Sequence, residues 1–425
     1  MDARNPSGPA VIVDPYSSGA LYAPAFREAG VPVVAVVTAP TPPEVYAASY
    51  RPEDFDEIIV ASGVASGDQA TAIARLSALR PRCVLAGCES GVELADALAP
   101  RVVPGVSNAP ETASARRDKG AMAAAVKQAG LPIIEQICTG DFAEVEAWIE
   151  RTGLAGRDLV IKPPKSASTD GVTRVARGEG LGDVFASMIG RANRLGIVND
   201  RLVVQEYCRG TEYVVDTASF AGTHSVSDIC RYHKIDNGDY MAVYESMAWM
   251  PPTLPAYHEL VAYAFGVLDA VGMRYGAAHV ELMLTDRGPR LIEVGCRPHG
   301  GGHPRFCRLA TGDSQLDRVV RQFSGGEPPP ASYVLQRHVL VQFLIARRAG
   351  YVHNAAALGQ VTALGSHHFS RISIRDGARL EATKDLFGSL DLGFVVLAHA
   401  DLAQVEADAR RVRELEQQIV LTPTP

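Results

Sequence analysis

The sequence lacks the features by which secreted, membrane-spanning and disulfide-bonded proteins are recognised. Its seven cysteines are an odd number and none of them forms a Cys-x-x-Cys pair, so we expect reduced cysteines that mostly fill the core. The amino-terminal stretch contains only a four-residue apolar run before an acidic residue. We therefore expect neither a signal peptide nor a membrane span, which predicts a cytoplasmic protein without membrane partners.

The chain also carries little net charge for its length. Its formal net charge is −7 and it has no long basic run, which argues against nucleic acid as a partner and leaves small molecules. Of its 425 residues, 47% are apolar, enough to fill roughly two to four packed units.

The first quarter of the chain has a regular alternation of elements. Residues 10–109 alternate short β-rich runs with helical runs, which predicts a doubly wound parallel sheet. The turn after the first strand lacks the Gly-x-Gly-x-x-Gly fingerprint, so dinucleotide binding is not expected there. The polar side chains expected beyond the carboxyl ends of the strands are Asp14, Tyr16, Ser17, Ser18 and Glu89.

Two lysines stand out in the next segment. Lys119 lies in the first turn of an expected helix, where a cation opposes the helix dipole, although a solvated surface lysine is the simpler interpretation. Lys162 ends an apolar strand and precedes a loop, residues 166–171, that is rich in hydroxyl groups and ends in glycine. Such donors suit a triphosphate, but the Walker pattern is missing and an ordinary hairpin remains an alternative.

A joint between strands follows at residues 205–208. It leaves the strand pattern for long enough to offer backbone N–H and C=O groups to a flat base, and Glu212 could accept hydrogen bonds from ribose hydroxyls. Exposed hairpins commonly carry such glutamates, so the motif is ambiguous by itself.

A hairpin with two glutamates is harder to explain by structure alone. The turn at residues 285–288 brings Glu281 and Glu293 close to facing one another. Like charges paired across a buried ladder destabilise each other unless a cation lies between them. Arg297 and the glycines 300–302 would then bind an anion and let the backbone approach a phosphorylated ligand. A strand that ends in a flexible turn is the alternative.

Taken in order, the two lysines, the joint, Glu281 and the Glu-x-x-x-Arg of residues 293–297 resemble the ATP-grasp superfamily, over about residues 10–420. The similarity is strongest to the carboxylate–amine ligase branch that includes bacterial L-amino acid ligases. This resemblance implies an α/β ATP-grasp fold in which two α/β lobes clasp ATP. The expected domains are an N-terminal Rossmann-like parallel-sheet domain (1–117), a central ATP-grasp lobe (118–199), an ATP-grasp lobe with the metal site (200–330) and a strand-rich C-terminal lobe (331–425).

The resemblance also implies a set of nucleotide contacts. The two lysines contact phosphates and a serine loop closes over them. The joint binds adenine through a glutamine side chain, a carbonyl and an amide, and a glutamate takes the ribose. In that order these residues are Lys119, Lys162, Ser168, Gln205, Glu206, Cys208 and Glu212.

For the reacting groups, the resemblance implies that Glu281 and Glu293 hold two Mg²⁺ ions, with Mn²⁺ as a substitute. Arg297 binds the transferring phosphoryl group, and Arg305 joins it at the tetrahedral intermediate. Many ATP-grasp proteins have asparagine two residues after the second metal glutamate, whereas this chain has Gly295, which puts the second ion in doubt.

The function implied is that of an ATP-dependent, ADP-forming carbon–nitrogen ligase. It would form an amide or peptide bond through an acyl phosphate, between an amino acid or similar small carboxylic acid and an amine or second amino acid. One alternative activates bicarbonate or formate, as carboxylases and purine-pathway enzymes do, and another is a nucleotide-binding protein with decayed catalysis. A homodimer is a further expectation.

Overall fold

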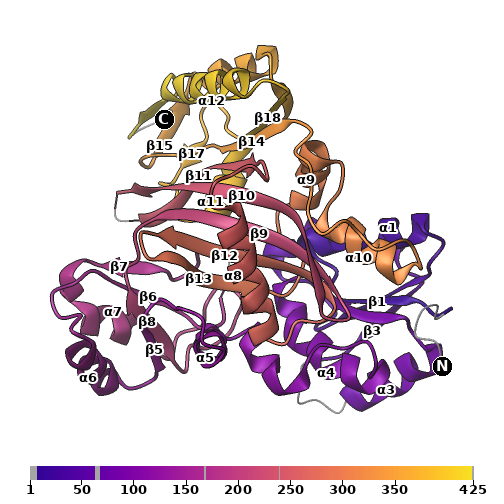
Figure 1. The fold of residues 1–425 in the computed structure, drawn as a ribbon. Coiled ribbons are helices and arrows are strands. Elements are labelled where there is room, and N and C mark those ends of the chain that lie inside the picture. The colour runs from indigo at the N-terminus through magenta and orange to yellow at the C-terminus, as the bar shows by residue number, and fades with distance from the viewer. Residues whose placement is uncertain (1–6, 63–67, 167–168, 239, 424–425) are drawn as a thin grey trace. The chain divides into compact units, whose positions relative to one another are not determined.

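The computed structural model describes residues 7–62, 68–166, 169–238 and 240–423 (Figure 1). Within these residues, none of the helices is both long enough and apolar enough to cross a membrane.

The chain forms two compact units, each assembled from separate stretches of sequence. One contains the chain up to Ile134 together with Val214–Ile229 and Pro252–Tyr333. The other contains Glu135–Tyr213, Cys230–Pro251 and the chain from Val334 onward. The four domains expected from the sequence stay a prediction.

The first unit begins with a parallel sheet in the strand order β3-β2-β1-β4, as the sequence predicts. Successive residues of β1 enter different cores: Ile12 packs in one core with Phe26, and Val11 in another with Leu98. A strand covered on both faces needs apolar residues at every position, which explains the unbroken apolar runs. The elements are β1 (Ala10–Val13), α1 (Tyr22–Glu28), β2 (Val33–Val37), α2 (Glu44–Ala47), β3 (Glu57–Val60), α3 (Asp68–Leu79), β4 (Cys83–Ala86) and α4 (Val92–Val102).

An antiparallel sheet completes the first unit, in the strand order β13-β12-β9-β10. Helix α8 lies along β12 and β13 (Figure 1). Strands β9 and β10 continue into the second unit. The elements are α5 (Lys119–Gln128), β9 (Thr211–Phe220), β10 (Thr223–Asn237), α8 (Tyr257–Ala270), β12 (Gly276–Thr285), β13 (Gly288–Gly295), α9 (His303–Thr311) and α10 (Gln315–Phe323).

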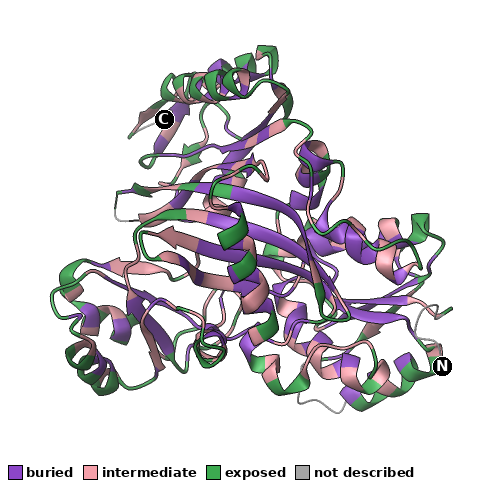
Figure 2. Ribbon diagram, in the orientation of Figure 1, coloured by how far each residue is buried: buried purple, intermediate pink, exposed green. Residues whose placement is uncertain are grey.

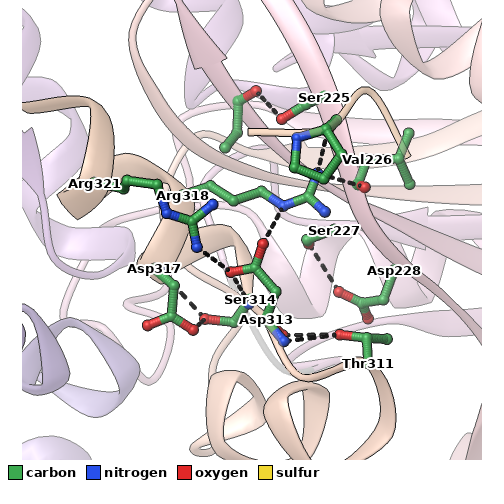
Figure 3. A network of polar contacts seen from close by, with 12 residues as sticks. Ser225, Val226, Ser227, Asp228, Thr311, Asp313, Ser314, Asp317, Arg318 and Arg321 are labelled. Atoms are coloured by element: carbon green, nitrogen blue, oxygen red, sulfur yellow. Dashed lines mark hydrogen bonds and ion pairs between the residues drawn. The ribbon is translucent and has the colours of Figure 1, made fainter. Parts of the chain in front are cut away.

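A buried arginine joins α10 to β10. Arg318 donates from Nε to Asp313, at 3.0 Å, and from Nη1 to the carbonyl of Val226, at 2.7 Å (Figure 3). The same network includes Ser227, whose hydroxyl donates to Asp228. These contacts hold the α9–α10 segment against the strand that carries Asp228.

The second unit contains a four-stranded sheet in the order β5-β8-β6-β7, with α6 and α7 packed on its apolar face. Trp148 of α6 and Phe185 of α7 share a core with Ile161 of β6. The elements are β5 (Gln136–Thr139), α6 (Phe142–Thr152), β6 (Leu159–Lys162), β7 (Thr173–Val175), α7 (Leu181–Met188) and β8 (Leu202–Glu206).

The rest of the second unit is rich in strands. Its part of the large sheet has the order β10-β11-β14-β18-β16, and a small sheet has the order β17-β15-β19. Helix α12 packs on β14 and β18, and its outer face is exposed (Figure 2). The elements are β11 (Tyr240–Met250), β14 (His338–Phe343), β15 (Gly350–His353), β16 (His367–Ile372), β17 (Arg379–Leu380), α11 (Leu386–Leu392), β18 (Gly393–His399), α12 (Leu402–Gln417) and β19 (Val420–Thr422).

Candidate active site

Two glutamates face one another on the hairpin of the first unit. Glu281 of β12 is the register partner of Glu293 on β13, and a β-bulge follows directly after Glu281. Nζ of Lys119 lies 2.9 Å from Oε2 of Glu293. The hairpin therefore collects two carboxylates and one ammonium group, as the sequence predicts for the two glutamates.

Lys119 is not a solvated surface residue, although that was the simpler interpretation of its sequence. It is the first residue of α5 and only 9% exposed. Its helix is capped by Asp118, whose carboxylate accepts hydrogen bonds from the N–H groups of Gly120 and Ala121. The cap compensates a helix start that is unfavourable for a cation, so that Lys119 can pair with Glu293.

The residues of the hairpin fit a divalent cation. Ligand atoms of His279, Glu281 and Glu293 all lie within 4.8 Å of one another. A divalent cation held by the two carboxylates would reduce the repulsion between them. Carboxylate oxygens suit Mg²⁺, whereas the imidazole of His279 is a ligand that transition metals prefer.

Arg297 lies in a chain of buried charges. Its Nε is 2.9 Å from Oε2 of Glu89, and Nη1 of Arg117 is 3.2 Å from the other oxygen of that carboxylate. Burial lowers the pKa of Arg297, but the neighbouring Glu89 outweighs this effect and raises the pKa above its usual value. Arg297 therefore stays charged.

Arg117 is a candidate residue that the sequence did not reveal. Its side chain is buried, and neither Nη1 nor Nη2 makes a hydrogen bond to any described residue. Its guanidinium group has an ion pair with Glu89 but no hydrogen bond from these two nitrogens, which suits a further anionic ligand. The one signal in the sequence is its position two residues before Lys119.

Gly295 has a local explanation. A Cβ atom at this position would lie 3.0 Å from Cζ of Arg297, so the glycine lets the guanidinium group pack against the backbone of β13. The departure from the asparagine of many ATP-grasp proteins is therefore connected to the placement of Arg297.

The glycine run makes contacts within the first unit. The N–H of Gly301 donates to the hydroxyl of Ser17, at 3.1 Å, and that of Gly302 to the hydroxyl of Ser18, at 3.0 Å. Both glycines adopt a positive φ, which favours this residue type. Their N–H groups thus tie the loop to the segment after β1. Arg305, three residues further on, is exposed on α9 and forms no ion pair with a described residue.

Polar residues also lie behind Glu281. Nε2 of His279 is 2.9 Å from Oε1 of Glu281, and burial lowers the pKa of His279 well below its ordinary value. Burial also lowers the pKa of His303, but the carboxylates of Asp216 and Asp228 outweigh this and raise it to about 9. Neither aspartate was expected from the sequence, in which both stand among polar as well as apolar strand residues.

The second unit contains the residues expected to bind the nucleotide other than Lys119, which belongs to the first unit. Lys162 is buried at the end of β6, and Gln205 is buried on β8. The loop begins at Tyr207, two residues later than the expected joint, because Glu206 still pairs with β6 and its N–H donates to the carbonyl of Glu135. Cys208 lies half-buried in the loop that follows, and Ser168 lies outside the described residues.

Glu212, the ribose candidate, has a cationic partner. Nζ of Lys234 lies 2.6 Å from its Oε1 and 4.3 Å from the ring centroid of Tyr244. Both charged side chains are largely buried. The ion pair and the aromatic ring hold the carboxylate of Glu212 in one orientation.

Comparison with known proteins finds relatives along most of the chain. The family described as ATP-grasp domain matches residues 155–303. Dapdiamide A synthase from Enterobacter agglomerans is 28% identical over 350 residues, which cover 81% of this chain and 78% of that protein.

Two solved structures share the fold. An L-amino acid ligase from Bacillus licheniformis matches with a TM-score of 0.73 and 17% identity, covering 98% of this chain and 99% of its own. A carboxyaminoimidazole ribonucleotide synthase from Aspergillus clavatus, complexed with ATP, matches with a TM-score of 0.69 and 14% identity, covering 97% and 100%. The mixed α/β architecture is thus that of the ATP-grasp fold. Residues 155–303 thus match the ATP-grasp domain, and the chain resembles the L-amino acid ligases of that fold and is an ATP-dependent ligase.

Proposed function

We propose that this ligase joins the carboxylate of a small acid, such as an amino acid, to an amine or a second amino acid. The observation that carries the proposal is the pair of opposed carboxylates, Glu281 and Glu293, with Lys119 beside them. This arrangement concentrates charge where a nucleotide phosphate and its cation would bind.

The reaction proposed has two steps. An oxygen of the substrate carboxylate attacks the γ-phosphorus of ATP, and the bond to ADP breaks. The amine nitrogen then attacks the carbonyl carbon of the acyl phosphate, phosphate leaves, and the nitrogen loses a proton. Neither step requires a nucleophile from the protein, whose contribution is alignment and charge.

In this proposal each charged residue of the first unit has one task. A divalent cation, Mg²⁺ or in its place Mn²⁺, would neutralise phosphate oxygens when held by Glu281 and Glu293. Lys119 contacts a phosphate, and Arg297 binds the transferring phosphoryl group and then the acyl phosphate that it forms. Arg305 contacts the tetrahedral intermediate.

The nucleotide contacts are proposed for the second unit. The buried positions of Lys162 and Gln205, and the ion pair that orients Glu212, support them. Glu206 and Cys208 would add backbone contacts to adenine, and Ser168 would act from the loop. The cytoplasmic location and the homodimer stay predictions of the sequence.

The direct test measures ADP and phosphate release from Mg²⁺-ATP with single amino acids and with pairs, with mass detection of the product. Release that requires two amino acids and yields their condensed mass supports the proposal. Glu293→Gln should lower turnover on the order of 100-fold or more. The reason is that the cation held by Glu293 would stabilise the charge of the transition state by several kcal/mol. The matched control is Asp286→Asn, an exposed acid in the turn of the same hairpin, which should leave turnover unchanged.

The fold shared with a carboxyaminoimidazole ribonucleotide synthase keeps a second candidate open. In that case bicarbonate or formate would replace the amino acid as the activated acid. ADP release that requires bicarbonate or formate, and no amino acid, would select this candidate. Tight ATP binding without ADP release under any of these conditions would instead favour decayed catalysis.

A further inference from the structure

Five ionisable side chains of the first unit form a buried His–Asp cluster behind Glu281. None of them is more than 8% exposed. Groups at such depth need partners because burial removes their hydration. The members are Asp216 on β9, Asp228 on β10, His279 on β12, His299 in the loop after β13 and His303 at the start of α9.

One carboxylate of the cluster uses only one of its two oxygens. Oδ2 of Asp216 accepts from Nδ1 of His299, at 2.8 Å, and from Nε2 of His303, at 2.9 Å. Oδ1 of Asp216 makes no hydrogen bond with any residue that the structure describes. His303 is turned to the Oδ2 side, because the same Nε2 is also 2.9 Å from Asp228.

The atom that faces this oxygen is a second acceptor. Nδ1 of His279 lies 3.9 Å from Oδ1 of Asp216, and it too lacks a hydrogen-bond partner in the described part of the chain. Because Nε2 of His279 donates to the carboxylate of Glu281, Nδ1 of the neutral ring presents a lone pair. Two buried acceptor atoms at this separation are unfavourable without a cation between them.

His299 completes a set of three ligands. Ligand atoms of Asp216, His279 and His299 all lie within 4.8 Å of one another. The backbone of His299 is held by Gln315, whose side chain accepts from its N–H at 2.7 Å and donates to the carbonyl of Ala278. Histidines that bind a metal usually donate their other ring N–H to a carboxylate, and His279 has such a partner in Glu281.

We propose that Asp216, His279 and His299 bind a first-row divalent ion of the Zn²⁺ class, separate from the cation of Glu281 and Glu293. Two imidazole nitrogens and one carboxylate oxygen are ligands that suit zinc and its neighbours better than Mg²⁺. The ion would join β9, β12 and the loop before α9, and through His279 it would orient Glu281. This inference does not depend on the ligase reaction proposed above.

The test is the metal content of the full chain, purified without a polyhistidine tag and passed through gel filtration in Mg²⁺ buffer. Elemental analysis should find about one first-row metal ion per chain. The Asp216→Asn and His279→Gln variants should each contain at least about tenfold less of this metal than the wild type. Glu293→Gln should keep it, and Co²⁺ substitution should produce visible absorption bands in that variant and in the wild type.

A measurement on the wild type alone covers the case in which a buried substitution prevents folding. Zn²⁺ added to chelator-treated protein should raise its Tm, since a ligand that binds the native state stabilises it. A wild type that contains no first-row metal and shows no Zn²⁺-dependent Tm would overturn the proposal. Metal retained by folded Asp216→Asn and His279→Gln, or lost from Glu293→Gln, would overturn it as well.

Discussion

Replacing Gly295 by alanine tests whether the position of Arg297 controls the reaction. The new Cβ would lie 3.0 Å from Cζ and 3.2 Å from Nε of Arg297. Non-bonded carbon atoms prefer about 3.5–4.0 Å, so the guanidinium group must move by roughly 0.5–1 Å. Gly295 has no positive φ, so alanine brings no backbone strain of its own.

The expected loss follows from that displacement. Nε of Arg297 is 2.9 Å from Glu89, and a shift of this size disturbs both the ion pair and the alignment with substrate. A misplacement of about 1 Å costs on the order of 100-fold in rate, so we expect kcat/KM to fall by about 10- to 100-fold. This corresponds to about 1.4–2.7 kcal/mol of transition-state stabilisation.

The assay is the initial rate of ADP release with the substrate pair identified in the amino acid matrix. Gly300→Ala is the matched control, because its Cβ would meet only the hydroxyl of Ser17, at an ordinary 3.5 Å. It lies in the same segment and should retain most of the activity. Thermal unfolding of both variants should show a Tm close to that of the wild type.

Two results would refute the reasoning. Wild-type kcat/KM in Gly295→Ala would mean that Arg297 tolerates displacement and does not align the reacting group. An equal loss in Gly300→Ala would mean that the loop responds to any added volume, whatever its distance from Arg297.

Lys234→Met should raise the KM for ATP more than it lowers kcat, because the glutamate 2.6 Å away loses the partner that orients it; ATP titrations of ADP release measure both. Arg116→Met should lower the free energy of unfolding by about 3–5 kcal/mol in urea titrations, since it leaves the buried carboxylate of Asp96 without its cation. Asp158→Asn should weaken acid destabilisation. The N–H of Arg177 lowers the pKa of Asp158, so its stabilisation is present above about pH 4 and is lost as pH falls through the lowered pKa. Unfolding titrations between about pH 5 and pH 2 should show a shallower slope in the variant.

The hairpin of Glu281 and Glu293 could be predicted because its geometry is local. Strands β12 and β13 are consecutive and joined by a short turn, so turn length and side-chain alternation determine which residues face one another. The parallel sheet could be predicted for a similar reason, since continuous apolar runs separated by helical ones leave few arrangements.

Contacts between distant segments could not be predicted in this way. Glu89 and Arg297 are separated by 208 positions, and nothing near either residue in the sequence indicates the other. Asp216 lies on β9, and its histidine partners lie on other elements. Their pairing depends on which strands become neighbours in the folded sheet.

The burial of Lys119 and of Arg305 could not be predicted from the sequence. Each is a cation near the start of a helix, yet Lys119 is buried and paired with Glu293 whereas Arg305 is exposed. The sequence by itself determined the α/β class, the family and the two opposed carboxylates, because these follow from periodicity, motif order and a short turn. Only the tertiary structure decided which polar groups are buried and with which partners, because burial depends on the packing of segments that are far apart in the chain.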